Sequence, residues 1–215
     1  MINIVVRVWL PDLPGALGRV ASALGSADAS LTGIDILERG SGWAVDELVV
    51  EVAESADAIA RIANALNAVD GVSVEDARVL NGEPVDPRLD ALETVAELVE
   101  QTTRAELFRV LVRRSAHDMS GVWVALVDSE SGVPLQTEGE GPSAPWMRAF
   151  IAGSQSSSAI ASGGAGPDDI AWTELPALEA TLIVGRDGRP FRERERYQLS
   201  AFARIADHCL RRLLP

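Results

Sequence analysis

Residues 10–24 read LPDLPGALGRVASAL, and this stretch decides how the first part of the chain folds. Apolar side chains alternate along residues 2–10 and then recur at helical spacing along residues 17–24. The stretch therefore predicts a strand that enters a helix through a tight turn around Pro14 and Gly15. The amino end of such a helix presents unpaired backbone N–H groups and a partial positive charge, so a carboxylate or another small anion can bind there.

The rest of the first eighty residues extends this pattern to the order strand, helix, strand, strand, helix, strand. Two strand-like segments flank the triplet Gly-Ser-Gly at residues 40–42, which predicts a hairpin. This order is the ferredoxin-like βαββαβ arrangement, an antiparallel sheet with two helices on one face. The predicted strands cover residues 2–10, 30–38, 43–52 and 72–80, and the predicted helices cover residues 17–24 and 59–69.

Residues 81–87 read NGEPVDP, a turn-rich segment that predicts a linker between two domains. We expect the first domain at residues 1–80 and the second at residues 88–215. The second domain mixes helical stripes with strand-like runs, so the whole chain falls in the α+β class. Its expected helices cover residues 89–99, 108–115, 146–151 and 202–213, its expected strands cover residues 121–128 and 177–184, and a Ser- and Gly-rich loop is expected over residues 153–169.

The charge of the chain limits its partners. The formal net charge is −13. Nucleic acids and anionic membranes are therefore not expected as partners, because binding them requires clustered positive charge. No apolar run approaches the roughly 18 residues that span a bilayer, and the first residues lack the pattern of a signal peptide. With Cys209 as the single cysteine, these features predict a cytoplasmic protein.

All 19 residues in the combined count of lysine and arginine are arginines. The absence of lysine excludes a Schiff-base lysine, a phosphate-loop lysine and a Ser-Lys dyad. The glycine-rich run at residues 162–166 therefore predicts a mobile surface loop, or a lid over a pocket, and not a phosphate cradle.

The first half of the chain resembles an ACT domain, a regulatory module that binds amino acids and similar small ligands. The resemblance depends on DLPGAL at residues 12–17, on the helix that follows, and on the order of elements over residues 1–80. It implies that backbone N–H groups of the loop bind the ligand carboxylate and that Asp12 meets the ligand amino group. It also implies that two modules pack side by side, with the ligand at the homodimer contact. The implied site residues are Asp12, Leu13, Pro14, Gly15, Ala16 and Leu17, with Ser30 and Leu31 at the start of the second strand, where Ser30 replaces the asparagine typical of the family.

The second half resembles a GAF domain. The resemblance depends on LIVGR at residues 182–186, on PFRERE at residues 190–195 and on the helical run 199–206. It implies an antiparallel sheet flanked by helices. The Asn-Lys-Phe-Asp-Glu signature of cyclic-nucleotide binders is absent from the sequence. Bilin-bearing members hold their chromophore on a mid-domain cysteine, whereas Cys209 lies in the last predicted helix, so no cofactor is expected.

Few residues suggest catalysis or metal binding. Asp12 fits either a helix cap or a contact to a ligand ammonium group, and the two roles can coexist. Ser115, His117 and Asp118 lie too close along one helix for the geometry of a catalytic triad. His208 and Cys209 lack the ligand spacing of a zinc site. We therefore expect no catalytic residue and no metal site.

These observations favour a non-catalytic regulatory or sensor protein. We expect it to bind an amino acid or a similar small metabolite at the ACT-like domain, to form a homodimer through that domain, and to act on an unidentified protein partner. The alternative is a ligand-independent dimerisation module that tunes a partner enzyme. The third hypothesis is an enzyme, and the only residues that could support catalysis are residues 115–118 and the acidic pairs.

Overall fold

The protein is described by a computed structural model that covers residues 1–80, 86–156 and 167–213. The chain divides into two compact units, Met1–Asp86 and Pro87–Pro215. The predicted linker, residues 81–87, lies mostly outside the described residues, and its last residue, Pro87, begins a helix. The assignment of the predicted domains to residues 1–80 and 88–215 stays a prediction.

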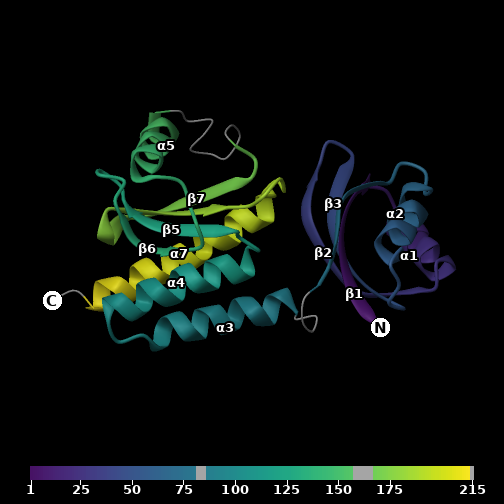
Figure 1. Ribbon diagram of the computed structural model, residues 1–215, viewed down its shortest axis with the longest axis horizontal. Helices are drawn as coiled ribbons and strands as arrows, with labels where there is room; N and C mark the ends of the chain where they lie inside the picture. The colour runs from purple at the N-terminus through teal and green to yellow at the C-terminus, as the bar shows by residue number, and fades with distance from the viewer. Residues whose placement is uncertain (81–85, 157–166, 214–215) are drawn as a thin grey trace. The chain divides into compact units, whose positions relative to one another are not determined.

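The first unit has the βαββαβ order that the sequence predicts. Its sheet has the strand order β2-β3-β1-β4, and every pair of neighbouring strands is antiparallel. Both helices lie on one face of this sheet (Figure 1). The elements are β1 (Ile2–Pro11), α1 (Ala16–Ser26), β2 (Ala29–Gly40), β3 (Trp43–Val52), α2 (Ala58–Asn67) and β4 (Ser73–Val79).

The core of the first unit follows from the two periodicities of its sequence. Alternate residues of β1 point toward the helices, and every third or fourth residue of each helix points back. The side chains that meet there are fully or almost fully buried, and each contributes about 1.5–3 kcal/mol through removal from water. They include Ile4, Val6, Val8, Val20, Leu24, Leu48, Ile62 and Leu66.

The second unit is also α+β. Its sheet has the strand order β6-β5-β8-β7 and is antiparallel throughout. The described elements are α3 (Pro87–Glu100), α4 (Arg104–Asp118), β5 (Trp123–Asp128), β6 (Pro134–Glu138), α5 (Ala144–Ser156), β7 (Ile170–Leu175), the short 3-10 helix η1 (Pro176–Leu178), β8 (Ala180–Gly185) and α7 (Glu193–Leu213). The α+β prediction is confirmed for both units, whereas membership of the GAF family stays a prediction.

The second sheet is covered on both faces. One face packs on α5 and the other packs on α4 and α7, with α3 outside these two helices (Figure 1). Strand β8 is accordingly buried along its whole length. The predicted loop at residues 153–169 was wrong at its first described residues and right at its last ones. Its first residues, 153–156, are the last turn of α5, its last residues, 167–169, lead into β7, and residues 157–166 lie outside the described residues.

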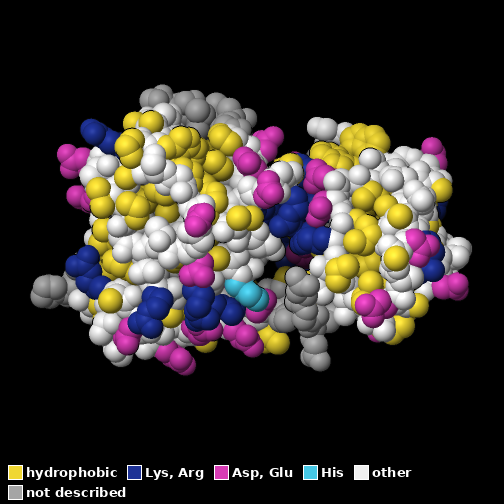
Figure 2. Space-filling model, viewed as in Figure 1, with side chains coloured by type: hydrophobic (Ala, Val, Ile, Leu, Met, Phe, Trp, Pro, Cys, Tyr) yellow, Lys and Arg dark blue, Asp and Glu magenta, His cyan; other side chains and the backbone are white. Residues whose placement is uncertain are grey.

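The surface agrees with the composition. Figure 2 shows acidic and basic side chains intermingled over the visible surface of each unit. Of the helices that the structure describes, none combines the length and the apolar character that a membrane span requires.

Candidate functional site

The β1–α1 loop uses some of its backbone donors internally. The N–H of Asp12 donates to the carbonyl oxygen of Gly42 at 2.9 Å, and the N–H of Leu13 donates to that of Pro11 at 2.8 Å. The N–H of Ala16 donates to the carbonyl oxygen of Leu13 at 3.1 Å. These bonds fix the loop against the β2–β3 hairpin and set the direction in which α1 leaves the sheet.

The start of α1 leaves other donors open. Among the described residues, nothing accepts a hydrogen bond from the N–H groups of Gly15, Leu17 and Gly18. Gly15 is the N-cap residue and adopts φ 83°, a left-handed conformation that favours glycine. No side chain caps the helix, and its first turn contains no acidic residue. The amide donors predicted from residues 10–24 are therefore available to an anion from outside.

Arg19 adds positive charge to these donors. A Cβ atom built on Gly15 would lie 4.0 Å from Nη1 of Arg19, so the guanidinium lies beside the turn. Both residues are exposed. Arg19 is not among the site residues predicted from the sequence, although its position one helical turn after Gly15 was a usable signal.

Asp12 pairs with Arg39, whereas the sequence predicted a bond to the start of the helix or to a ligand ammonium group. Its carboxylate accepts a hydrogen bond from Nε of Arg39 at 3.2 Å and a second one from Nη2 of the same guanidinium. Arg39 lies near the end of β2, and this contact raises its pKa above the ordinary value. The interpretation of Asp12 as a helix cap is wrong, because Gly15 occupies the cap position and no side chain bonds to the helix start. Recognition of a ligand ammonium group by Asp12 stays a prediction.

Asp46 is a second carboxylate in the same region. It lies on β3 between Val8 of β1 and Ile36 of β2, on the face that the helices cover, and is only 3% exposed. Its Oδ1 atom is buried without a hydrogen-bond partner. Burial raises the pKa of Asp46; the positive charge of Arg39 opposes this effect and the negative charge of Asp12 adds to it.

Asp46 gives a prediction about pH. Because its pKa is raised in the folded state, the folded protein binds more protons than the unfolded chain between the two pKa values, so stability falls as pH rises through that window. Asp46→Asn removes this loss, and we expect it to stabilise the first unit by about 1 kcal/mol at pH 7. At pH values below the unfolded pKa the variant and the parent should be similar. Urea denaturation from pH 3 to pH 7 measures the effect.

The exposed Asp70→Asn is the control for the loss of one formal charge in the same unit. It should change the free energy of unfolding by less than about 0.5 kcal/mol. An Asp46→Asn variant that is less stable than the parent at pH 7 would contradict this account of the buried carboxylate.

Ser30 and Leu31 lie away from the loop within one chain. They pair with Glu51 and Val50 of β3, whereas the loop lies at the end of the sheet where Leu10 pairs with Ala44. About six residues of strand separate the two places, roughly 20 Å. The structure therefore brings residues 12–17 together and leaves Ser30 and Leu31 at the opposite end of the same sheet.

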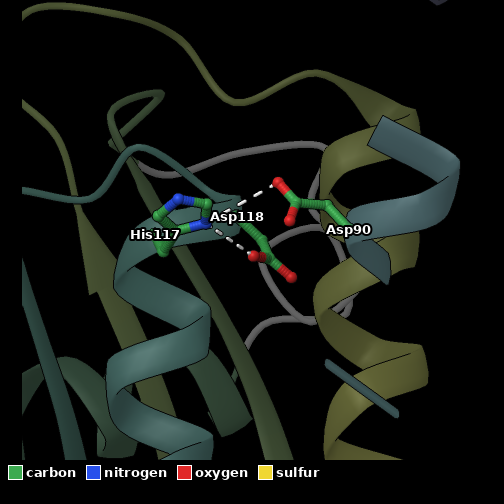
Figure 3. Close-up of side chains that lie close together, drawn as sticks. All are labelled: Asp90, His117 and Asp118. Atoms are coloured by element: carbon green, nitrogen blue, oxygen red, sulfur yellow. Dashed lines mark hydrogen bonds and ion pairs between the residues drawn. The ribbon is translucent and has the colours of Figure 1, made fainter. Parts of the chain in front are cut away.

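A polar cluster lies between α3 and α4 in the second unit (Figure 3). Nδ1 of His117 is 3.0 Å from Oδ1 of Asp118 and 3.7 Å from Oδ2 of Asp90. One ligand atom from each of the three side chains lies within 4.8 Å of the others. His117 and Asp118 are candidates that the sequence offers, whereas Asp90 was missed because it comes from the preceding helix.

A buried arginine balances the charge of this cluster. Arg114 is 7% exposed, and its Nε donates to Oγ1 of Thr94 at 2.6 Å. Its Nη2 lies 3.4 Å from Oδ1 of Asp90 and 3.6 Å from Oδ1 of Asp118. The Thr94 hydroxyl in turn donates to Oδ2 of Asp118 at 2.5 Å. The guanidinium supplies the positive charge that a metal ion would bring, so the arrangement fits a contact that holds α3 on α4.

Burial raises the pKa of Asp118, while its hydrogen bonds to Thr94 and His117 and the charge of Arg114 oppose this rise. Ser115 is fully buried, and its Oγ has no hydrogen-bond partner. Since Ser115 does not bond to His117, the described geometry lacks the contact between nucleophile and base that a triad requires.

The tryptophans of the second unit pack against one another. Trp123 meets Trp146 edge to face, with ring centroids 6.4 Å apart, and Trp146 stacks on Phe150 at 5.2 Å. Phe150 meets Trp172 edge to face at 5.1 Å. These rings form one row that includes two residues of α5. Trp123, Phe150 and Trp172 are partly buried against the apolar cluster under α5, whereas Trp146 is 38% exposed. Two surface hollows of about 440 and 360 Å³ also lie on this unit, along α5 and α7.

Comparison with known proteins supports the assignment of the first unit. The family model of the ACT domain matches residues 4–71, which run from β1 through α2 and include the β1–α1 loop. The ACT resemblance is thus confirmed for this part of the chain. None of the curated proteins matches the chain.

Two solved structures show low similarity. One is an unknown protein from Galdieria sulphuraria, 16% identical, with a TM-score of 0.33 and a match over 47% of this chain and 64% of that one. The other is a formyltetrahydrofolate deformylase from Pseudomonas putida, 16% identical, with a TM-score of 0.30 and a match over 46% of this chain and 39% of that one. In both cases the chain spans less than two thirds of the other protein.

Proposed function

We propose that the protein is a non-catalytic regulator that binds an amino acid, or a similar small zwitterion, at the β1–α1 loop of its ACT domain. ACT domains are regulatory modules that bind small ligands and often dimerise. The observation that carries the proposal is the charge pattern at this loop, where free amide donors with Arg19 lie on one side and excess carboxylate lies on the other.

The amide side of the loop fits a carboxylate. The open N–H groups of Gly15, Leu17 and Gly18 coincide with the positive end of the α1 dipole. Gly15 leaves room for close approach of a ligand to the backbone, and Arg19 adds a charge-assisted donor. A ligand carboxylate there would complete a turn that lacks any acidic side chain of its own.

The acidic side of the loop fits an ammonium group. Asp12 and Asp46 both interact electrostatically with one guanidinium, that of Arg39. Two carboxylates against one arginine leave a formal charge of −1 when all three are ionised. A bound ammonium group would neutralise this excess and lower the raised pKa of Asp46.

A homodimer would complete the site. The loop of one chain lies on an exposed surface, and β2 is an edge strand of the sheet. If two β2 edges pair antiparallel about a two-fold axis near Asp35, then Ser30 and Leu31 of one copy come opposite Gly40 and Arg39 of the other. The two parts of the predicted site, separate within one chain, would then meet across the contact.

The ligand-independent module remains the second function to test. Ile34 and Ile36 on β2 and Leu13 in the loop are 40–63% exposed, which suits a contact between copies with no ligand between them. In either case we propose a cytoplasmic protein that acts through a partner enzyme, with no catalytic step of its own.

The test is calorimetric titration and thermal shift with a panel of the common amino acids. We expect one ligand or a small group to bind, and at 100 times its dissociation constant to stabilise the first unit by about 2.7 kcal/mol. Arg19→Ala should weaken binding about tenfold, whereas Arg109→Ala, an exposed arginine of the second unit, should leave it unchanged.

Asp46→Asn should remove the preference for an amino acid over the analogue that lacks the amino group. A flat panel, together with a dimer that forms without ligand, would favour the ligand-independent module. Binding that is unaffected by both Arg19→Ala and Asp46→Asn would move the site away from this loop.

A further inference from the structure

Helix α3 carries an apolar stripe on its outer face. Leu89, Leu92 and Val99 are 52%, 67% and 51% exposed, and Ala96 between them is exposed as well. The opposite face of the same helix holds Thr94 and Leu98, which are fully buried in the second unit. The stripe is therefore additional to the face that holds α3 in its own fold.

The spacing of the stripe is that of a helix–helix seam. Its four residues follow one another at intervals of three, four and three, which are the a and d positions of a heptad pattern. Single exposed apolar residues are common on protein surfaces, but a row of four along one helix face marks an interaction surface. Ala96 is small, so it allows a second helix to approach closely.

The charges beside the stripe indicate which helix can pair with α3 and in which orientation. Arg88 occupies a g position, and Glu93 occupies the next e position. In a parallel, in-register pair of identical helices, each Arg88 faces the Glu93 of the other helix. An antiparallel pair would instead bring the e positions, Glu93 and Glu100, toward one another, and these repel.

We propose that α3 pairs with the α3 of a second copy of this chain as a parallel two-helix contact. Leu98 and the Thr94–Arg114 hydrogen bond already hold the helix in its unit, so pairing does not require α3 to fold first. The contact spans 14 residues, is smaller than a standard interface, and is expected to be reversible. It is independent of the ligand proposed for the first unit.

Disulfide trapping tests the contact in the full chain. Cys209 is the single native cysteine and is buried, so Cys209→Ala gives a background without free thiols. A parallel pair places each Leu92 beside its own copy, within reach of a disulfide. Leu92→Cys should therefore form covalent dimers at least tenfold faster than Val122→Cys, which has a similar exposure of 59% on the same unit but lies outside the stripe.

Charge reversal tests the orientation. Arg88→Glu or Glu93→Arg should each slow trapping at Leu92→Cys several-fold, and the double variant should restore the rate. Equal rates at positions 92 and 122, or single reversals without effect, would overturn the proposal.

Analytical ultracentrifugation of Leu92→Glu separates this proposal from the one for the first unit. If the Leu92→Glu variant remains dimeric and Leu92→Cys fails to form covalent dimers, the dimer proposed through β2 is retained and the one through α3 is excluded. A parent chain that is monomeric at high concentration would exclude both contacts.

Discussion

Arg114→Met is expected to lower the free energy of unfolding of the second unit by about 3–5 kcal/mol. Arg114 is 7% exposed and touches Asp90, Thr94 and Asp118, of which Asp118 has a side chain only 1% exposed. Its loss leaves a buried carboxylate without its counter-charge and removes a donor to the Thr94 hydroxyl. Urea denaturation at pH 7, followed by circular dichroism, measures the change.

The neighbouring residue provides a matched control. Arg113 forms an ion pair with Glu97, but its side chain is 52% exposed. Arg113→Met should therefore cost less than about 1 kcal/mol. Adding Asp118→Asn to Arg114→Met should recover part of the stability, because the buried group is then neutral. Equal effects at positions 113 and 114 would mean that the cluster between α3 and α4 does not hold the two helices together.

The first unit could be predicted because its signals are local. The alternation along β1 and the helical spacing along α1 belong to elements with one buried face, so the periodicity in the sequence and the burial in the structure coincide. The turn between these elements was also predicted, from Pro14 and Gly15, and Gly15 adopts a left-handed conformation there that favours glycine.

The second unit was harder to predict because its sheet is covered on both faces. Buried strands such as β8 lose the alternation that identifies a half-buried strand. The two edge strands, β6 and β7, have only five and six residues, so neither gives a clear period. Strand β7 was consequently left without a prediction, although its pairing with β8 is regular.

The backbone donors of the candidate site were predicted from the sequence, but the contacts between its side chains were missed. Open amides at α1 follow from the helix start alone, whereas the Asp12–Arg39 pair joins residues 27 apart and depends on the β2–β3 hairpin. Asp46 did leave a signal in the sequence. It occupies an inward position in the alternation from Ala44 to Val52, where an acid is out of place unless a charge or a ligand compensates it.

Gly185→Ala is expected to destabilise the second unit by about 3 kcal/mol and to leave the first unit unchanged. Gly185 is the last residue of β8 and pairs with Trp123 of β5. A Cβ atom at this position would lie 2.1–2.4 Å from three atoms of the Trp123 indole ring. The ring can avoid this overlap only if it leaves its edge-to-face contact with Trp146, so overpacking is added to a loss of aromatic packing.

In a background in which Trp9 and Trp43 of the first unit are replaced by phenylalanine, tryptophan fluorescence during urea denaturation follows the second unit, and amino-acid titration follows the first. The expected result is an earlier unfolding transition with ligand affinity unchanged, because the two units are separately compact. The control is Gly153→Ala in α5, where an added Cβ meets nothing within 4 Å. That change should stabilise the helix by about 0.5–1 kcal/mol. A Gly185→Ala variant in which the second unit unfolds earlier and the amino-acid affinity of the first unit is lost as well would show that the two units fold as one cooperative body.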